Sequence, residues 1–191
     1  MSLSEEGTVG RETGEKRRAD QRILDEVEKL IRGRQTLKLA TVDGEGNPEA
    51  SYAPFLWSGE TGFYIYVSEL AQHTRNLLAG SSASILLVED EDGAKEIFAL
   101  RRLTVRCTVW EIERGDPDFD SVLEAMEERH GGVVAGLKRM LDFHLFRLVP
   151  EKVGRLVLGF GQAYQIEGVG LDRLFRGVER RVGGGGHRTA D

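Results

Sequence analysis

The feature that most constrains the fold is a series of short segments with alternating apolar residues, joined by turns. Residues 36–42 (TLKLATV) alternate, and residues 43–48 (DGEGNP) have the composition of a turn. Residues 49–57 provide a return strand, residues 58–62 turn again, and residues 63–67 (FYIYV) favour a third strand because they are aromatic and β-branched. The pattern predicts an antiparallel meander.

More strands are expected after a short helix that Ser68 caps and Gly80 ends. The later strands are expected over residues 83–88, 96–113, 142–149 and 155–166, with a helical insert over 118–141 that breaks at Gly131-Gly132. Strands and helices do not alternate regularly, which argues against a doubly wound parallel sheet. Many short antiparallel strands indicate a closed or split barrel, which leaves no exposed edge. We therefore predict a mainly β fold, an antiparallel split β-barrel with flanking helices.

The barrel domain is expected to span residues 20–168. Residues 1–19 are polar and carry few large apolar groups, so we predict a disordered lead. From Asp20, an apolar stripe with helical spacing predicts a helix that ends at Gly33. Residues 169–191 are expected to form a tail, either flexible or covering a cofactor site, because four consecutive glycines interrupt it.

Composition excludes several classes of protein. The net charge is −6, and a nucleic-acid partner is not expected without a basic excess. Cys107 is the only cysteine, so one chain can form neither a disulfide nor a cysteine-based zinc site, and we expect a small apolar residue in a strand. No stretch approaches the roughly 20 apolar residues of a membrane span, so no membrane partner is expected and the cytoplasm is the default location.

Four motifs resemble those of the HugZ/HutZ family, a heme-utilisation branch of the pyridoxamine-5'-phosphate-oxidase-like, FMN-binding split barrels. They are LATVDxxGxP at 39–48, SELAQHTRNL at 68–77, RLT at 102–104 and GFGQA at 159–163. The resemblance covers roughly residues 20–166, and its most specific part is residues 68–77. It implies a homodimer with a cofactor site at the subunit interface. The cofactor is FMN in most of the superfamily, whereas this branch binds and degrades heme.

The resemblance also assigns roles to three residues. Heme-degrading relatives use a histidine from a C-terminal loop as the axial iron ligand, and His187 matches it because it is the only histidine of the tail. Asp142 matches the acidic residue that hydrogen-bonds this ligand across the dimer. Arg102 matches the arginine of the RLT motif, which stabilises oxygen or another anion on the other face of the porphyrin. Without the resemblance, these would be a solvated tail histidine, a strand-start aspartate and a solvated arginine.

The segment after the third predicted strand is a candidate anion site. A helix N-terminus, hydroxyl groups and a guanidinium group occur together there, and the candidate cofactor-binding residues are Ser68, Gln72, His73, Thr74 and Arg75. In flavin-binding relatives, the FMN phosphate lies near this region. In heme-binding relatives, the heme propionates are the groups that could bind there. The alternative is an exposed amphipathic turn. His130 and His144 are expected to be structural or solvated.

Three functions remain open, and the third of them involves no turnover. The leading hypothesis is an oxidoreductase that binds heme and opens the porphyrin with oxygen, releasing iron. It requires an external electron donor, because no Gly-x-Gly-x-x-Gly motif for a nicotinamide cofactor lies between a strand and a helix. The alternative is an FMN-dependent oxidoreductase. The third reading is a non-catalytic carrier of heme or flavin.

Overall fold

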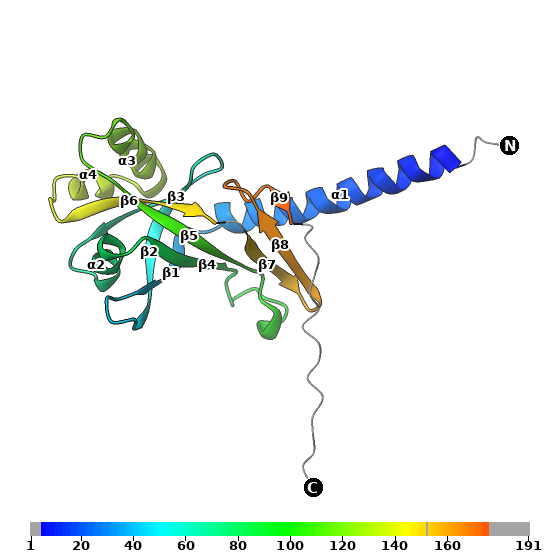
Figure 1. Cartoon of the computed structure of the whole chain (residues 1–191), viewed down its shortest axis with the longest axis horizontal. Coiled ribbons are helices and arrows are strands. Elements are labelled where there is room, and N and C mark those ends of the chain that lie inside the picture. Colours follow the sequence, from blue (N-terminus) through cyan, green and yellow to red (C-terminus); the bar gives the residue numbers. More distant parts are fainter. Residues whose placement is uncertain (1–4, 152, 176–191) are drawn as a thin grey trace, which may run out of the picture.

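The computed structural model describes residues 5–151 and 153–175, with side chains from residue 14 onward. The described helices are α1 (Glu5–Arg32), α2 (Gln72–Ala79), α3 (Pro117–His130) and α4 (Val133–Leu137), with a 3₁₀ turn, η1, at Ile97–Ala99 (Figure 1). The strands are β1 (Thr36–Val42), β2 (Pro48–Ser58), β3 (Gly62–Ser68), β4 (Ser82–Val88), β5 (Arg102–Ile112), β6 (Phe143–Pro150), β7 (Gly154–Gly159), β8 (Gln162–Glu167) and β9 (Arg173–Leu174).

Six of these strands close into a barrel. Their order is β4-β1-β2-β3-β6-β5, and β4 also pairs with β5, which completes the circle. Strands β7, β8 and β9 continue the sheet outward from β5. Every pairing is antiparallel. The predicted antiparallel split barrel with flanking helices is confirmed, including the helical insert and its break after His130.

Strand β5 joins the barrel to its extension. Residues 102–108 pair with β4 along one edge, while the other edge pairs first with β7 and then with β6. Its residues alternate strictly: Leu103, Val105, Cys107 and Val109 are buried, and the residues between them face outward. Burial, with a smaller effect of the Glu151 carboxylate, raises the pKa of the Cys107 thiol to about 12. Cys107 is therefore a neutral core residue, as expected.

The helices cover particular parts of the barrel. The C-terminal half of α1 places Val27 and Ile31 in the main core, next to side chains of the barrel strands. Helices α3 and α4 pack over a second cluster that includes Tyr64 and Tyr66 of β3 (Figure 1). Because β3 is covered on both faces, its residues 62–67 are all buried, and it lacks the alternation of β5.

Two predictions about the N-terminal segment need correction. Helix α1 begins at Glu5, well before the predicted start at Asp20, so the expected disordered lead is helical from Glu5 onward. Its N-terminal half projects away from the barrel (Figure 1). A helix held by packing of Val27 and Ile31 extends at little cost through residues 15–19 (EKRRA), which favour helices, because nucleation is the expensive step. Among the described residues, no helix has the length and apolar character required to cross a membrane.

The C-terminal part also differs from the prediction. Residues 155–166 form a hairpin of β7 and β8 instead of one strand, and Gly161 adopts φ +69° at the turn. Residues 169–175 pack onto the folded domain and do not form a separate tail, because Leu171 is 1% exposed in the main core and β9 pairs with β8. The remainder of the predicted tail, residues 176–191, lies outside the described residues.

One broad surface of the sheet carries no helix over much of its area; we call it the outer face. The outward residues of six strands form a continuous row across it: Tyr52, Lys38, Leu86, Thr104, Arg155 and Gln165. Tyr52 is 63% exposed, and Trp110, further along β5, is 54% exposed. Large aromatic side chains exposed on a sheet face are typical of a surface that another molecule covers.

The main core predicts a strong dependence of stability on Phe55. This ring is fully buried, lies 5.7 Å from the Phe63 ring and carries the Arg129 guanidinium 5.3 Å from its centroid. We expect Phe55→Ala to lower the free energy of unfolding by about 3–5 kcal/mol. The control is Phe98→Ala, which removes the same side chain from an 84% exposed position and is expected to change it by about 0.5 kcal/mol or less. Urea unfolding measures both, and similar losses in the two variants would contradict this core.

Candidate functional site

Arg102 lies at the start of β5 on the outer face. Its neighbours on the adjacent strands are Val88 of β4 and Val157 of β7. Among the described residues, its guanidinium makes one hydrogen bond, donated to the carbonyl oxygen of Leu100 at 3.1 Å. Its other N–H groups remain available to a ligand. An arginine with spare donors between two apolar neighbours suits the edge or face of a flat anionic molecule.

Arg101 has a different environment from Arg102. It precedes β5, and its guanidinium binds the carboxylates of Glu89 at 2.7 Å and Glu26 at 3.0 Å. Hydrogen bonds and charge from these two groups raise the pKa of Arg101, against a smaller effect of burial. Arg101 therefore links β4, β5 and α1, which leaves Arg102 as the arginine of the pair that is open to a ligand.

Asp142 lies immediately before β6 and is joined to the loop before α2. The Ser68 hydroxyl donates a hydrogen bond to the Asp142 carboxylate at 2.6 Å, and the Glu69 amide donates to the Asp142 carbonyl at 2.8 Å. Ser68 is thus not the helix cap that the sequence predicted. Helix α2 begins at Gln72, its N-cap is Ala71, and no side chain caps it. The Asp142 carboxylate is oriented by Ser68 and retains lone pairs for a further donor.

The predicted anion-binding residues of α2 mostly bind one another. The Arg75 guanidinium donates to the Gln72 side-chain oxygen at 2.5 Å and to the Glu69 carbonyl at 2.6 Å. The Thr74 hydroxyl donates to the Ser68 carbonyl at 2.6 Å. An anion would have to replace these bonds, so the segment holds Asp142 in place more directly than it offers an anion cradle. Its role in binding a cofactor stays a prediction.

His73 is the exception within α2. Its side chain is 9% exposed, and its Nε2 atom is buried without a hydrogen-bond partner in the described part of the chain. Burial lowers the pKa of His73, against a smaller opposing effect of the Glu49 carboxylate. The ring is therefore neutral at pH 7 and carries an unpaired nitrogen, which has the properties of a ligand or a hydrogen-bonding group for a molecule bound beside α2.

The other two described histidines have structural partners, as expected. The ring nitrogen Nε2 of His130 lies 2.9 Å from the Phe55 carbonyl oxygen. His144 lies between two carboxylates, with Nε2 2.7 Å from Glu69 and Nδ1 2.6 Å from Glu111. This histidine joins β6 to Glu111 of β5 and to Glu69 in the loop before α2. The sequence did not indicate the two glutamates, because they are distant along the chain from His144.

Arg102 and Asp142 do not meet within one chain. Arg102 is at one end of β5, whereas Asp142 lies beyond the other end, where Ile112 pairs with Leu145. Ten residues of strand separate Arg102 from Ile112, a distance of about 30 Å at roughly 3.3 Å per residue. The structure therefore does not assemble these two predicted site residues in one subunit. His187 lies outside the described residues, and no cluster of three potential metal ligands occurs within them.

The outer face also carries two arginines that the sequence analysis did not select. Arg106 lies four residues after Arg102 on the same side of β5, and Arg155 of β7 pairs with Thr104 between them. The alternation of β5 was a usable signal for Arg106, since residues 102, 104 and 106 must share a face. The position of Arg155 beside Thr104 could not be predicted in this way, because it depends on which strand pairs with β5.

The chain is similar to known proteins over most of its length. A model of the pyridoxamine 5'-phosphate oxidase family matches residues 23–156. The chain is 44% identical over 147 residues to heme oxygenase HutZ of Vibrio cholerae, which covers 77% of this chain and 82% of the relative.

Two solved structures are similar in fold and sequence. The crystal structure of HutZ from Vibrio cholerae, described as a heme storage protein, has a TM-score of 0.68 and 38% identity, covering 71% of this chain and 94% of that one. Campylobacter jejuni ChuZ has a TM-score of 0.67 and 36% identity, covering 75% of this chain and 58% of that one. The range matched by the family model, residues 23–156, includes Arg102 and Asp142.

The position of His144 predicts a pH-dependent contribution to stability. Burial acts to lower the pKa of His144, but its hydrogen bonds and ion pairs with Glu111 and Glu69 outweigh burial and raise it. A raised pKa in the folded state stabilises the protein fully below the unfolded value of about 6.5 and no longer does so once the pH exceeds the folded value. We expect His144→Gln to lower the free energy of unfolding by up to about 1 kcal/mol more at pH 6 than at pH 8.5.

Urea unfolding of both proteins at the two pH values measures this difference, at one fixed protein concentration. His130→Gln is the matched control, because its ring contacts a carbonyl oxygen and no carboxylate in the described residues. A deficit of His144→Gln that is the same at both pH values, or larger at pH 8.5, would contradict the ion pairs.

Proposed function

Because the chain belongs to the pyridoxamine 5'-phosphate oxidase family and, within it, to the HutZ-like branch, we propose that it binds heme and degrades it with oxygen, releasing the iron. The observation that carries this proposal is the 44% identity to a heme oxygenase over 77% of the chain. The barrel also presents an arginine with spare donors on an open sheet face. Electrons would come from an external donor.

The heme site requires two copies of the chain. Arg102 and Asp142 lie about 30 Å apart in one subunit, at opposite ends of β5, which exceeds the reach of one porphyrin. In a two-fold dimer that places Arg102 of one subunit near Asp142 of the other, the dimer would hold two equivalent sites. Exposed Tyr52 and Trp110 on the outer face support burial of that face by a second copy.

Each residue has a specific task in this site. Arg102 would direct its unused N–H donors at bound heme, to stabilise negative charge that develops during the reaction. His187 would hold the iron, and Asp142, oriented by the Ser68 hydroxyl, would accept the second ring N–H of that histidine, which would fix its tautomer and increase its basicity. Bound heme supplies the redox chemistry itself, and the protein supplies orientation and electrostatics.

Two other functions are favoured by single observations. The matching family model describes pyridoxamine 5'-phosphate oxidase, which favours an FMN-dependent oxidoreductase. A flavin phosphate at Ser68–Arg75, however, would have to displace the hydrogen bonds that Thr74 donates to Ser68 and that Arg75 donates to Glu69. The description of HutZ as a heme storage protein favours heme binding without turnover. Both alternatives differ from the proposal in properties that can be measured.

The test is an absorption titration of the apo-protein with hemin and, separately, with FMN. We expect a saturating Soret band for the wild type and no tight binding of FMN. His187→Ala is expected to shift the band and weaken hemin binding by about 10-fold or more, because the axial ligand is lost. Thr189→Ala, two residues further on, is the control and should retain the wild-type spectrum.

Ascorbate and oxygen are then added to the heme complex. Loss of the Soret band with release of ferrous iron is the expected result. A stable Soret band under these conditions would favour storage over degradation. Tight binding of FMN without a specific Soret band would contradict the heme site and favour the flavin oxidoreductase.

A further inference from the structure

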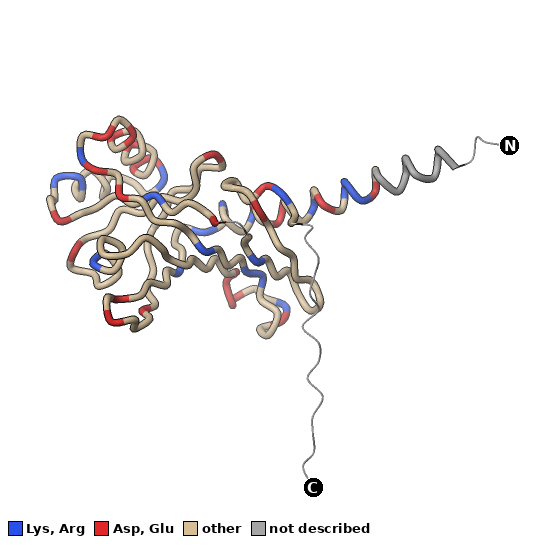
Figure 2. Tube along the Cα trace, in the orientation of Figure 1, with Lys and Arg blue, Asp and Glu red and all other residues tan. Residues whose placement is uncertain are grey.

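Three arginines gather around Thr104 on the outer face. Arg102 and Arg106 lie on β5, two residues before and two residues after Thr104, and Arg155 is paired with Thr104 on β7. Arg155 is therefore the diagonal neighbour of both other arginines, at about 7–8 Å between backbones. Figure 2 shows basic positions on strands in the middle of the sheet, whereas acidic positions lie mainly in loops and helices. The cluster is a local concentration of positive charge in a chain of net charge −6.

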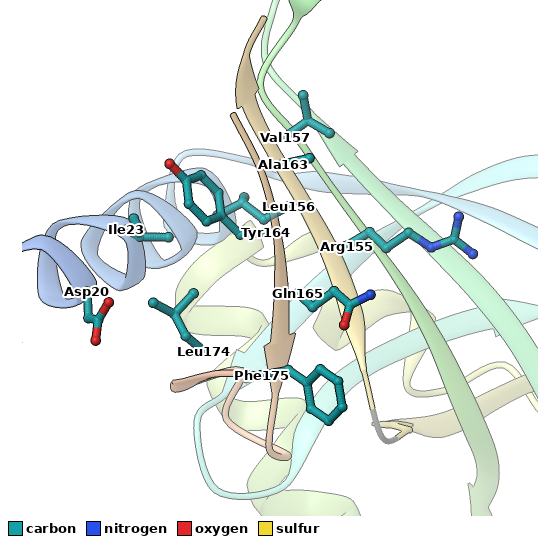
Figure 3. Close-up of a pocket in the computed structure, with 10 residues that line it drawn as sticks. All are labelled: Asp20, Ile23, Arg155, Leu156, Val157, Ala163, Tyr164, Gln165, Leu174 and Phe175. Carbon is teal, nitrogen blue, oxygen red and sulfur yellow. The ribbon is translucent and has the colours of Figure 1, made fainter. Parts of the chain in front are cut away.

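A cavity of about 640 Å³ lies at this cluster. Its polar lining comes from four strands and the loop before β7: Ser84, Thr104, Arg106, Glu151, Arg155 and Gln165. Figure 3 shows Arg155, Gln165 and Phe175 on one side of the β7–β8 hairpin, away from the side that faces α1. The 640 Å³ cavity thus combines guanidinium and hydroxyl donors, and its volume is typical of a small-molecule site.

The charges of this cavity are not balanced within the chain. Neither Arg106 nor Arg155 forms an ion pair or a side-chain hydrogen bond within residues 14–151 and 153–175. Glu151 at one edge offsets one of the two charges, which leaves the lining positive. Neighbouring like charges on a sheet repel each other unless an anion binds between them. The arrangement therefore favours a ligand with acidic groups.

We propose that Arg106 and Arg155 bind the carboxylates of the heme, its propionates, while Arg102 lies over the porphyrin. This inference rests on the proposed function and specifies how the substrate is oriented. Four residues of β5 separate Arg102 from Arg106, about 13 Å along the strand. With flexible side chains at both ends, this span matches a porphyrin whose centre is near Arg102 and whose acidic edge is near Arg106. Paired guanidinium groups bind carboxylates with two parallel hydrogen bonds, which orients the ring as well as holding it.

The test compares hemin with hemin dimethyl ester, in which both carboxylates are blocked. We expect the wild-type protein to bind hemin at least about 10-fold more tightly than the ester, because charge-assisted hydrogen bonds are lost. Arg106→Gln and Arg155→Gln should each weaken hemin binding by about 10-fold and leave ester binding unchanged. Arg106→Lys keeps the charge and should retain part of the preference.

Arg32→Gln is the matched control, since it removes an exposed arginine of α1 that pairs with Glu28. It is expected to leave both affinities unchanged. The ester also controls for folding and assembly, because a damaged variant would lose both ligands.

Four outcomes would overturn the inference. Wild-type protein that binds hemin and its ester equally would show that the carboxylates are not recognised, while heme binding itself would stand. Glutamine variants that lose both ligands equally would place the two arginines in assembly or folding. FMN binding that depends on Arg106 and Arg155, without a preference for hemin over its ester, would make the cluster a phosphate site. Absence of any hemin binding to the wild type would remove the proposed function together with this inference.

Discussion

Pairing of β5 along both edges is the constraint on which the rest of the structure depends. Its contact with β4 closes the barrel, and its other edge is shared between β6 and β7, so the barrel and its extension meet at one strand. Strict alternation then divides its side chains. Leu103, Val105 and Cys107 enter the core, so Arg102 and Arg106, which alternate with them, must face outward. The hydrophobic core therefore determines where the charged residues of the site lie.

The same strand keeps two residues of the proposed heme site apart within one subunit. Its length separates Arg102 from Asp142, and no rearrangement of side chains bridges that distance. Asp142 is nevertheless held in a defined position. Ser68 donates a hydrogen bond to its carboxylate, and His144, two residues further on, contacts Glu69 of the loop before α2 and Glu111 of β5. The Asp142 carboxylate accepts a hydrogen bond from Ser68 and pairs with no cation among the described residues, so under the proposed function its further partner would come from the heme site. A symmetric second copy would complete two such sites.

Much of this was predictable from the sequence, for physical reasons. An alternating segment such as residues 36–42 can bury only one of its two faces, so the meander could be predicted from the pattern of alternating residues and turns. The start of α1 was not predictable, because the helix extends from a packed segment into residues that contribute no apolar surface. The hairpin at Gly161 was missed because continuous β-propensity masked a glycine turn. The partners of His144 and the cluster around Thr104 depend on strand pairing between distant segments, which no local pattern encodes.

The most direct test of the shared heme site is activity of a mixed dimer. Arg102→Gln and Asp142→Asn chains, carrying different affinity tags, are produced together, and the dimer bearing both tags is isolated. Each variant alone is expected to lose heme degradation by about 10-fold or more. In the mixed dimer, one site combines both substitutions and the other is intact, so the account predicts about half of the wild-type activity. A mixed dimer as inactive as its two parents would contradict a site shared between subunits.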